Sequence, residues 1–552
     1  MMRVSCRRSG SGLFACPMLT RAAAATMALV AMQLAGIAQT VLFEATGTTA
    51  GDGFGWSVAF LDDLDGDGQD DWIVGSPGDG SGGVDAGMAT VFSGTNGTVL
   101  HTFHGSQANR EFGYAVASGG DSDLDGVGDI LIGAPGGGRA KLFSGATGAL
   151  LLELTGSGEF GAALCSIGDW SGDGRRDIVV GAPGANRVSV HDGVTGALLA
   201  TMQGSGRYGH SVADIGDVDI DGVADLACGA PRYFVYLPDM GKVSVYSGAT
   251  ASLLYSLEGH TEGMEFGWSI AGMGDVTGDG RSDVVIGARG HGSLHCWDDG
   301  RVDLVSGPNG SLLQRWEGSC DSMLGCSVAP VGDVNQDGVT DVIAGEAKRN
   351  RFHIYSAADG DTLLTHADTT NMGWAVTGGG DVNGDGYPDF IATSPGSSVW
   401  PPFWSGIGKV QVMTMGCPSD AAYSYCPLTP NSVGAGAVIY HQNSLNISAN
   451  NLRLVSTDLP ASQMGLFYYG PDASQIPFGN GNRCVSGGAY RLGVVPTGTG
   501  TCSYLVDYTN PPQTSGQITA GSTWSFQFWY RDPSAGGAGY NLSDALRLHF
   551  CP

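Results

Sequence analysis

Short apolar runs alternate along this chain with turns rich in glycine and aspartate. Some runs alternate apolar with polar residues, as in KVSVYSG (242–248) and RVSVHDG (187–193), and others are continuously apolar and follow an acidic loop. Alternation with period two and short apolar runs bounded by turn residues are both typical of β-strands. The 552 residues include 92 glycines, which do not recur at every third position as they do in collagen. The pattern therefore predicts an all-β chain of many short strands and tight turns.

The pattern repeats seven times. The first copy reads FGWSVAFLDDLDGDGQDDWIVGSP from Phe54, and the second reads FGYAVASGGDSDLDGVGDILIGAP from Phe112. Five further copies begin at Phe160, Tyr208, Phe266, Leu324 and Met372. Repetition at a fixed period indicates that each copy is one structural unit that stacks on its neighbours.

Each unit predicts four strands. The first follows Phe-Gly, the second is the apolar run after the acidic loop, the third alternates, and the fourth resembles LLLELTG (150–156). Seven four-stranded units favour a seven-bladed β-propeller, with a β-solenoid as the alternative. The seventh unit ends after its third strand, KVQVMTM (409–415), whereas TVLFEATG (40–47) matches a fourth strand and precedes the first unit. We therefore expect the N-terminal strand to close blade seven and to remove an exposed sheet edge.

Residues 1–38 have the features of a signal peptide, namely arginines, an apolar run and a small-residue ending at Ala38. An N-terminal membrane anchor is the alternative. Residues 39–416 would then form the propeller and 417–552 a C-terminal domain. After cleavage the chain has 22 basic and 54 acidic side chains, a net charge of −32. This charge excludes nucleic acid as a natural partner, and no later apolar stretch is long enough to span a membrane. The predicted location is secreted, cell-surface or periplasmic.

The loop pattern D-x-[D/N/S/T]-x-D-G-x-x-D places oxygen donors at positions 1, 3, 5 and 9, and the carbonyl of position 7 can join them. Hard oxygen donors around a glycine turn favour calcium, with up to seven ions in the chain. The alternative is a set of solvated Asp-Gly turns. The expected ligands, in blade order, are Asp63, Asp65, Asp67, Gln69 and Asp71; Asp121, Asp123, Asp125, Val127 and Asp129; Asp169, Ser171, Asp173, Arg175 and Asp177; Asp217, Asp219, Asp221, Val223 and Asp225; Asp275, Thr277, Asp279, Arg281 and Asp283; Asp333, Asn335, Asp337, Val339 and Asp341; and Asp381, Asn383, Asp385, Tyr387 and Asp389.

The third position differs among the blades. Blades three and five offer only a hydroxyl there, from Ser171 and Thr277. Because a neutral hydroxyl is a weaker ligand for a divalent cation than a carboxylate, these two sites should bind less tightly.

Phe-Gly at the head of four of the units, Gly-Ala-Pro after the second strand and the acidic loop between them resemble the FG-GAP repeats of integrin alpha-chain propellers. Gly-Ala-Pro is intact in three blades, as at 133–135, and reads Gly345-Glu346-Ala347 in blade six. The resemblance covers residues 40–416 and implies a calcium-binding propeller that acts in adhesion. Related repeats occur in a glycosylphosphatidylinositol-specific phospholipase D and in exported bacterial proteins.

The residue after Phe-Gly is aromatic or histidine in five blades. A position that recurs around a propeller forms a ring of side chains, and in the resembling family such rings hold a cation of a partner through cation–π attraction. Ordinary packing between blades is the alternative. The candidate ligand-binding residues are Trp56, Tyr114, His210, Trp268 and Trp374.

After Cys417 the acidic repeats stop, and runs such as TWSFQFWY (523–530) predict a small β-sandwich. Its ending resembles terminal modules of secreted planctomycete-type bacterial proteins. Its aromatic residues either bind sugars or form the core. In an exported chain disulfides are permitted, and Cys484–Cys502 and Cys296–Cys320 are the pairs that spacing suggests.

These features favour a secreted calcium-binding propeller that acts as a binding or adhesion module for an extracellular protein or glycan. The alternatives are an extracellular hydrolase or lyase, either phospholipase D-like or polysaccharide-acting, and a structural cell-surface scaffold. No catalytic constellation is evident, so we expect a protein that is not an enzyme. The irregular insert at 288–300, with His291, His295, Asp298 and Asp299, is the one place where chemistry or a transition metal would be sought.

Overall fold

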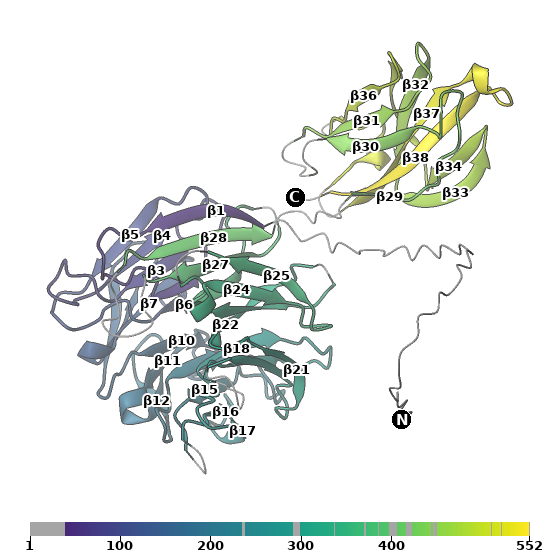
Figure 1. Cartoon of the computed structure of the whole chain (residues 1–552). Coiled ribbons are helices and arrows are strands. Elements are labelled where there is room, and N and C mark those ends of the chain that lie inside the picture. The colour runs from purple at the N-terminus through teal and green to yellow at the C-terminus, as the bar shows by residue number, and fades with distance from the viewer. Residues whose placement is uncertain are drawn as a thin grey trace, which may run out of the picture. The chain divides into compact units, whose positions relative to one another are not determined.

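The computed structural model describes residues 39–550 except 235–237, 291–297, 336, 369–370, 385, 397–405, 416–421, 443–444, 446–449, 509 and 520–521. In these residues the only helical segments are short 3₁₀ turns, and strands form the rest of the regular structure. Figure 1 shows the strands in two groups, one formed by residues 39–415 and the other by residues after 421. The all-β prediction is confirmed.

Seven antiparallel four-stranded sheets form the first group. We call them blades one to seven. Their strands, in spatial order, are β2 (Ser57–Phe60), β3 (Trp72–Ser76), β4 (Met88–Phe92) and β5 (Val99–His104); β6 (Val116–Gly120), β7 (Asp129–Ala134), β8 (Arg139–Phe143) and β9 (Leu150–Thr155); β10 (Ala163–Ile167), β11 (Asp177–Ala182), β12 (Arg187–His191) and β13 (Leu198–Gln203); β14 (Ser211–Asp214), β15 (Leu226–Ala230), β16 (Lys242–Tyr246) and β17 (Leu253–Glu258); β18 (Ser269–Gly274), β19 (Asp283–Ala288), β20 (Arg301–Val305) and β21 (Leu312–Glu317); β22 (Leu324–Gly332), β23 (Asp341–Glu346), β24 (Arg351–Tyr355) and β25 (Thr362–Ala367); and β26 (Val376–Gly380), β27 (Asp389–Ser394), β28 (Lys409–Met415) and β1 (Gln39–Thr46). The 3₁₀ turns η1 (Pro135–Gly137), η2 (Pro183–Ala185) and η3 (Ala347–Arg349) follow three of the second strands.

The N-terminal strand belongs to the last blade. β1 pairs antiparallel with β28, from Gln39 opposite Met415 to Thr46 opposite Lys409, and it is the fourth strand of that sheet. The expected origin of the missing strand is confirmed. Because β1 covers the backbone edge of β28, blade seven has the same four strands as the others.

Each blade packs on the next through its own apolar cluster. The cluster between blades one and two joins Ile73 and Val91 to Ile130 and Ile132, and equivalent clusters follow at every later junction. The last cluster joins Ile391 of blade seven to Trp72 of blade one. First strands also contact their neighbours in turn, from β2 and β6 to β26, and β26 contacts β2. These sheets fit a seven-bladed β-propeller.

The Phe-Gly and Gly-Ala-Pro signatures explain this close packing. A Cβ at Gly133 would lie 2.1 Å from the carbonyl oxygen of Gly161 in the next blade, so no side chain fits there. Gly161 has φ of +93°, a conformation that glycine adopts most easily. At the corresponding place in blade seven Thr393 replaces the glycine, and its hydroxyl donates a hydrogen bond of 2.6 Å to the carbonyl of Gly55.

The second group of strands forms a β-sandwich. A five-stranded sheet has the order β29 (Ala422–Ser424), β38 (Tyr540–His549), β37 (Thr523–Arg531), β32 (Met464–Gly470) and β35 (Tyr490–Pro496); a three-stranded sheet has β30 (Val438–Gln442), β31 (Arg453–Thr457) and β36 (Cys502–Leu505); and a hairpin has β33 (Asp472–Phe478) and β34 (Gly481–Ser486). The turns η4 (Thr514–Gly516) and η5 (Pro533–Ala535) complete it. Ile439 and Leu454 of the three-stranded sheet pack on Phe467, Phe526 and Phe528 of the five-stranded sheet, so both sheets share one core. Most of the aromatic residues of TWSFQFWY lie in it.

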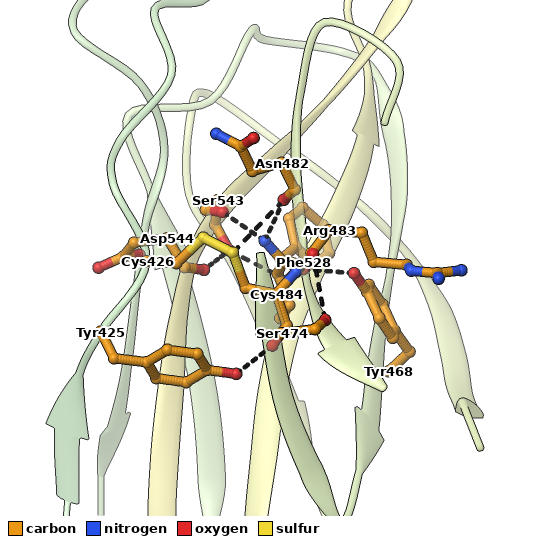
Figure 2. Close-up of a disulfide and its surroundings, with 11 residues drawn as sticks. Tyr425, Cys426, Tyr468, Ser474, Asn482, Arg483, Cys484, Phe528, Ser543 and Asp544 are labelled. Carbon is orange, nitrogen blue, oxygen red and sulfur yellow. Dashed lines mark hydrogen bonds between the residues drawn. A yellow bond between two sulfur atoms is a disulfide. The ribbon is translucent and has the colours of Figure 1, made fainter. Parts of the chain in front are cut away.

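The predicted Cys484–Cys502 pair is wrong. Cys484 forms a disulfide with Cys426, with Cα atoms 6.2 Å apart, and Cys502 is a buried free thiol (Figure 2). The reason is that Cys502 lies on β36 of the three-stranded sheet, whereas Cys484 lies on the β33–β34 hairpin. Cys320 is also disulfide-bonded, but its expected partner, Cys296, lies outside the described residues.

Candidate metal loops and central cavity

The seven acidic loops occupy the same place in every blade, between the first and the second strand. Their ninth-position aspartates stand at the start of the second strand and are buried, whereas the described aspartates at positions 1, 3 and 5 are half-buried or exposed. Asp385 of blade seven lies outside the described residues. The buried set is Asp71, Asp129, Asp177, Asp225, Asp283, Asp341 and Asp389.

Backbone N–H groups orient the first aspartate of the loop. In blade one Asp63 accepts hydrogen bonds from the N–H groups of Gly66, Asp67 and Gly68, at 2.7, 3.1 and 2.8 Å. Asp217 of blade four has the same three bonds. The backbone of the turn therefore fixes the direction of these carboxylates independently of any ligand.

The ninth aspartate has a second role that its sequence position did not reveal. Asp71 accepts the N–H of Leu64 through Oδ2 and the N–H of Gly94 through Oδ1, both at 2.8 Å. Asp225 makes the same two bonds, at 2.8 Å, with Val218 and Gly248. Each bond pair ties the acidic loop to the turn that follows the third strand. The glycine that recurs after the third strand was the feature of the sequence from which this contact could have been predicted.

Burial changes the acidity of these carboxyl groups. It raises the pKa of Asp71, Asp129 and Asp225 to about 6 and that of Asp341 to about 7, against the hydrogen bonds from backbone N–H groups, which favour the ionised form. A buried carboxylate of this kind is stabilised by a positive charge nearby. The loops therefore present negative charge where burial disfavours it.

Three of the predicted ligand sets converge as carboxylate clusters. Within each cluster one oxygen per residue lies within 4.8 Å of the others, and the clusters consist of Asp63, Asp65 and Asp71; Asp121, Asp123 and Asp125; and Asp217, Asp219 and Asp225. Among the described residues no such cluster of acidic, histidine or cysteine side chains forms in the other four loops. The converging blades are the three that have a carboxylate at the third position.

Blades three and five differ in a further way. Their seventh-position arginines extend to the preceding blade, where Arg175 donates to the carbonyl of Ser122 at 2.7 Å and Arg281 donates to that of Val218 at 3.0 Å. Both carbonyls lie one residue after the first aspartate of a converging loop. The guanidinium groups thus brace the loops of blades two and four.

The three clusters fit a divalent cation that prefers oxygen. Their donors are carboxylates only, with no sulfur or imidazole, and hard cations such as calcium take six to eight oxygens including backbone carbonyls and water. Three negative charges held this close repel one another unless a cation balances them. The chemistry of the donor set therefore agrees with the expected ion class.

A cavity of about 310 Å³ lies where the first strands of the seven blades meet. The residue after Phe-Gly, or after its counterpart in blades four, six and seven, lines the cavity in every blade. The structure therefore brings together all five predicted ligand-binding residues. The rings of Trp374 and Trp56 are 4.8 Å apart, those of Trp56 and Tyr114 are 5.3 Å apart, and those of His210 and Trp268 are 4.2 Å apart. The same side chains therefore pack against those of neighbouring blades and line a common cavity.

A cation of the chain itself already occupies part of this aromatic ring. The Arg289 guanidinium lies 3.0 Å from the centroid of the Trp268 ring, and its Nε donates to Glu265 at 2.8 Å. Arg289 stands where every blade except five and six has a proline, so Gly-Ala-Arg was the feature of the sequence that could have indicated it. The sequence reasoning missed this residue.

Charge at the cavity disfavours protonation of its histidine. Burial, together with the positive charges of Arg289 and Arg207, lowers the pKa of His210 to about 3. Arg207 itself pairs with Glu159. His210 is therefore neutral near physiological pH and a weak base.

The irregular insert gives no metal site in the described residues. His291 and His295 lie outside them, Asp298 pairs with Lys348 at 2.8 Å, and Asp299 is buried. The Lys348 pair shows that Asp298 braces blade six.

Comparisons with known proteins agree with this architecture. The FG-GAP repeat family matches residues 54–92 and 372–413. Integrin alpha-V of Gallus gallus is 31% identical over 181 residues, which cover 28% of this chain and 17% of that integrin. Integrin alpha-5 of Xenopus laevis is 31% identical over 182 residues, covering 27% and 17%, and integrin alpha-3 of Cricetulus griseus is 29% identical over 172 residues, covering 28% and 16%.

The aligned part of the chain thus spans 16 to 17% of the length of these relatives. Together the repeats and the similarities support an integrin alpha-like FG-GAP propeller. Within the described residues, no helix has the length and apolar character needed to cross a membrane.

Proposed function

We propose that this integrin alpha-like chain is a secreted or cell-surface calcium-binding module that engages an extracellular protein or glycan. Residues 1–38 act as a signal peptide cleaved near Ala38, residues 39–416 form the propeller, and residues 417–552 form the C-terminal domain. The central cavity, lined by one residue from every blade, is the observation that carries the binding role.

Calcium in the acidic loops supports this role indirectly. The loops of blades one, two and four have converging carboxylates, which would be the principal calcium ligands. The other four loops keep their proposed ligands but bind more weakly, since they lack a charged third residue. A bound cation balances the buried ninth aspartate and stiffens the hairpin that carries the first strand, whose residues line the cavity.

The cavity is better suited to binding than to acid–base catalysis. A general base works best with a pKa near the working pH, whereas burial, Arg289 and Arg207 lower the pKa of His210 to about 3. Trp56, Tyr114 and Trp374 instead offer a continuous aromatic surface on which an apolar or cationic group can pack.

Arrays of extracellular matrix proteins and glycans, probed with the purified chain in calcium and in chelator, test the proposal. We expect binding to at least one class of ligand, and a reduction of tenfold or more, about 1.4 kcal/mol, when Trp56 and Trp374 are both changed to alanine. Phe234→Ala is the matched control, because Phe234 is an exposed aromatic outside the cavity lining. Unchanged binding by a folded double variant would exclude the cavity as the site.

A further inference from the structure

The β-sandwich has a second cavity, of about 480 Å³, that differs in chemistry from the central one. It lies on the outer face of the five-stranded sheet, where Leu466 of β32, Trp529 of β37 and Leu542 of β38 are side-by-side neighbours in register. Successive residues of a strand point to opposite faces. Phe467 and Phe528 therefore fill the core while Leu466 and Trp529 face this groove.

Aromatic residues form the floor and one wall of the groove. The Trp529 and Tyr540 rings are 5.6 Å apart, and Phe478 of the β33–β34 hairpin is 5.7 Å from Tyr540. Phe478 and its neighbour Ile476 are 42% and 46% exposed. Exposed aromatic rings of this kind offer flat surfaces to the C–H faces of sugars.

Two arginines complete the lining. Arg483 of β34 and Arg491 of β35 have no carboxylate partner within the part of the chain that the structure describes. The Arg483 guanidinium lies 5.8 Å from the Phe478 ring centroid, and its Nε is buried without a hydrogen-bond partner. Figure 2 shows Arg483 and Tyr468 on the side of the hairpin away from the disulfide.

These two charges stand out against the composition of the chain. The whole sequence has a net charge of −28, whereas residues 417–552 contain five arginines and six aspartates and no lysine or glutamate. The Cys426–Cys484 disulfide fixes the hairpin that carries Arg483, and so does the Gln527 side chain, which accepts the N–H of Cys484 and donates to the carbonyl of Asn482. Unpaired guanidinium groups on a fixed hairpin are complementary to an anion, and their planar forks match the two oxygens of a carboxylate.

We propose that this groove binds a carboxylated polysaccharide, with sugar rings on Trp529, Tyr540 and Phe478 and uronate carboxylates on Arg483 and Arg491. The groove has three aromatic rings and two cationic side chains. The rings can stack on sugars, whereas an acidic peptide would be matched better by more positive charge and fewer flat rings, so a sugar polymer is favoured. The site belongs to the sandwich and does not depend on the function proposed for the propeller.

Polygalacturonate is a suitable probe, and its fully methyl-esterified form is the matched neutral polymer. Binding by the full chain is measured by affinity electrophoresis in chelator, so that neither calcium bridging nor the calcium loops contribute. We expect binding to polygalacturonate and at least tenfold weaker binding to the esterified polymer. The double variant Arg483→Gln, Arg491→Gln should lose about tenfold or more in affinity.

Arg453→Gln is the control, since Arg453 lies on β31 of the other sheet and bonds to Ser503. It should bind as the unchanged chain does, and circular dichroism establishes that each variant folds. Trp56→Ala, in the propeller cavity, should also leave this binding unchanged. No binding to polygalacturonate, equal binding to the esterified polymer, equal or tighter binding to dextran sulfate, or undiminished binding by the double arginine variant would each overturn the proposal.

Discussion

At the scale of single residues, Glu346 shows how one substitution in a repeat creates a local interaction. It replaces the alanine of Gly-Ala-Pro in blade six and is 1% exposed. Its carboxylate accepts hydrogen bonds from Arg351 and from His353, the latter at 2.7 Å. Burial alone would raise the pKa of Glu346, but these bonds outweigh it and lower the pKa to about 2.

Because the folded pKa of Glu346 is depressed, its contribution to the free energy of unfolding is present above the unfolded value of 4.5 and is lost as pH falls toward 2. Glu346→Gln should therefore cost about 3 kcal/mol at pH 7, as expected when one partner of a buried ion pair is removed. The difference from the unchanged chain should shrink between pH 4.5 and pH 2. Denaturant melts at several pH values measure it. Glu258→Gln, which disrupts an exposed pair with Lys242, should change stability by less than about 1 kcal/mol at any pH.

The residue at the third position of the acidic loop should decide how tightly each loop binds calcium. Asp219 contributes to the carboxylate cluster of blade four, whereas Thr277 holds the same position in blade five, where no such cluster forms among the described residues. Asp219→Ala should remove one tightly bound calcium per chain, and Thr277→Ala should not. Equilibrium dialysis at about 0.1 mM free calcium, within the range of extracellular modules, counts the ions. Equal stoichiometry in both variants would contradict the distinction between charged and uncharged loops.

At the level of strands and blades, the hydroxyl of Thr393 allows the stability of the junction between blades seven and one to be tested. Thr393 donates a buried hydrogen bond to the Gly55 carbonyl where other junctions have a glycine. Thr393→Val keeps the shape but leaves that carbonyl unpaired, so it should lower the free energy of unfolding by about 1–2 kcal/mol. Thr201→Val, on the exposed face of β13, should be nearly neutral. A neutral Thr393→Val would mean that this junction is held by apolar packing alone.

The strand pattern was predictable from the sequence because its signals are local. Alternating strands and acidic loops recur within each unit, and the strand at 40–47 could be matched to the missing fourth strand by its pattern alone. Pairings between distant residues were not predictable. The partner of Cys484 depends on which sheet Cys502 joins, and the contact between Arg289 and Trp268 depends on the direction of one side chain. The pattern of the acidic loop likewise predicted the ninth aspartates only as ligands, because their bonds to the turn after the third strand join residues that are distant in the sequence.

At the scale of the whole molecule, the fold must accommodate a large excess of negative charge. The 54 acidic side chains exceed the 26 basic ones, and the acidic loops hold much of the excess at one kind of hairpin in every blade. If calcium binds these loops in the folded state and not in the unfolded chain, it must stabilise the fold by mass action. For one site at a free concentration 100 times its dissociation constant, this amounts to about 2.7 kcal/mol.

Removal of divalent cations should therefore lower the melting temperature of the full chain by several degrees. About 1 kcal/mol shifts the midpoint of a domain this large by roughly 1–2 °C, and each filled site contributes about 2.7 kcal/mol. Differential scanning calorimetry in calcium, in magnesium and in chelator measures the shift. Calcium should restore it fully and magnesium only in part, because magnesium requires a tighter octahedral shell than these open loops offer. A chain that lacks the carboxylate clusters of blades one, two and four, through Asp65→Ala, Asp123→Ala and Asp219→Ala, should respond much less to the chelator. A melting curve that is the same in calcium and in chelator would contradict the cation role of the loops, since no other group in the described residues brings three carboxylates together.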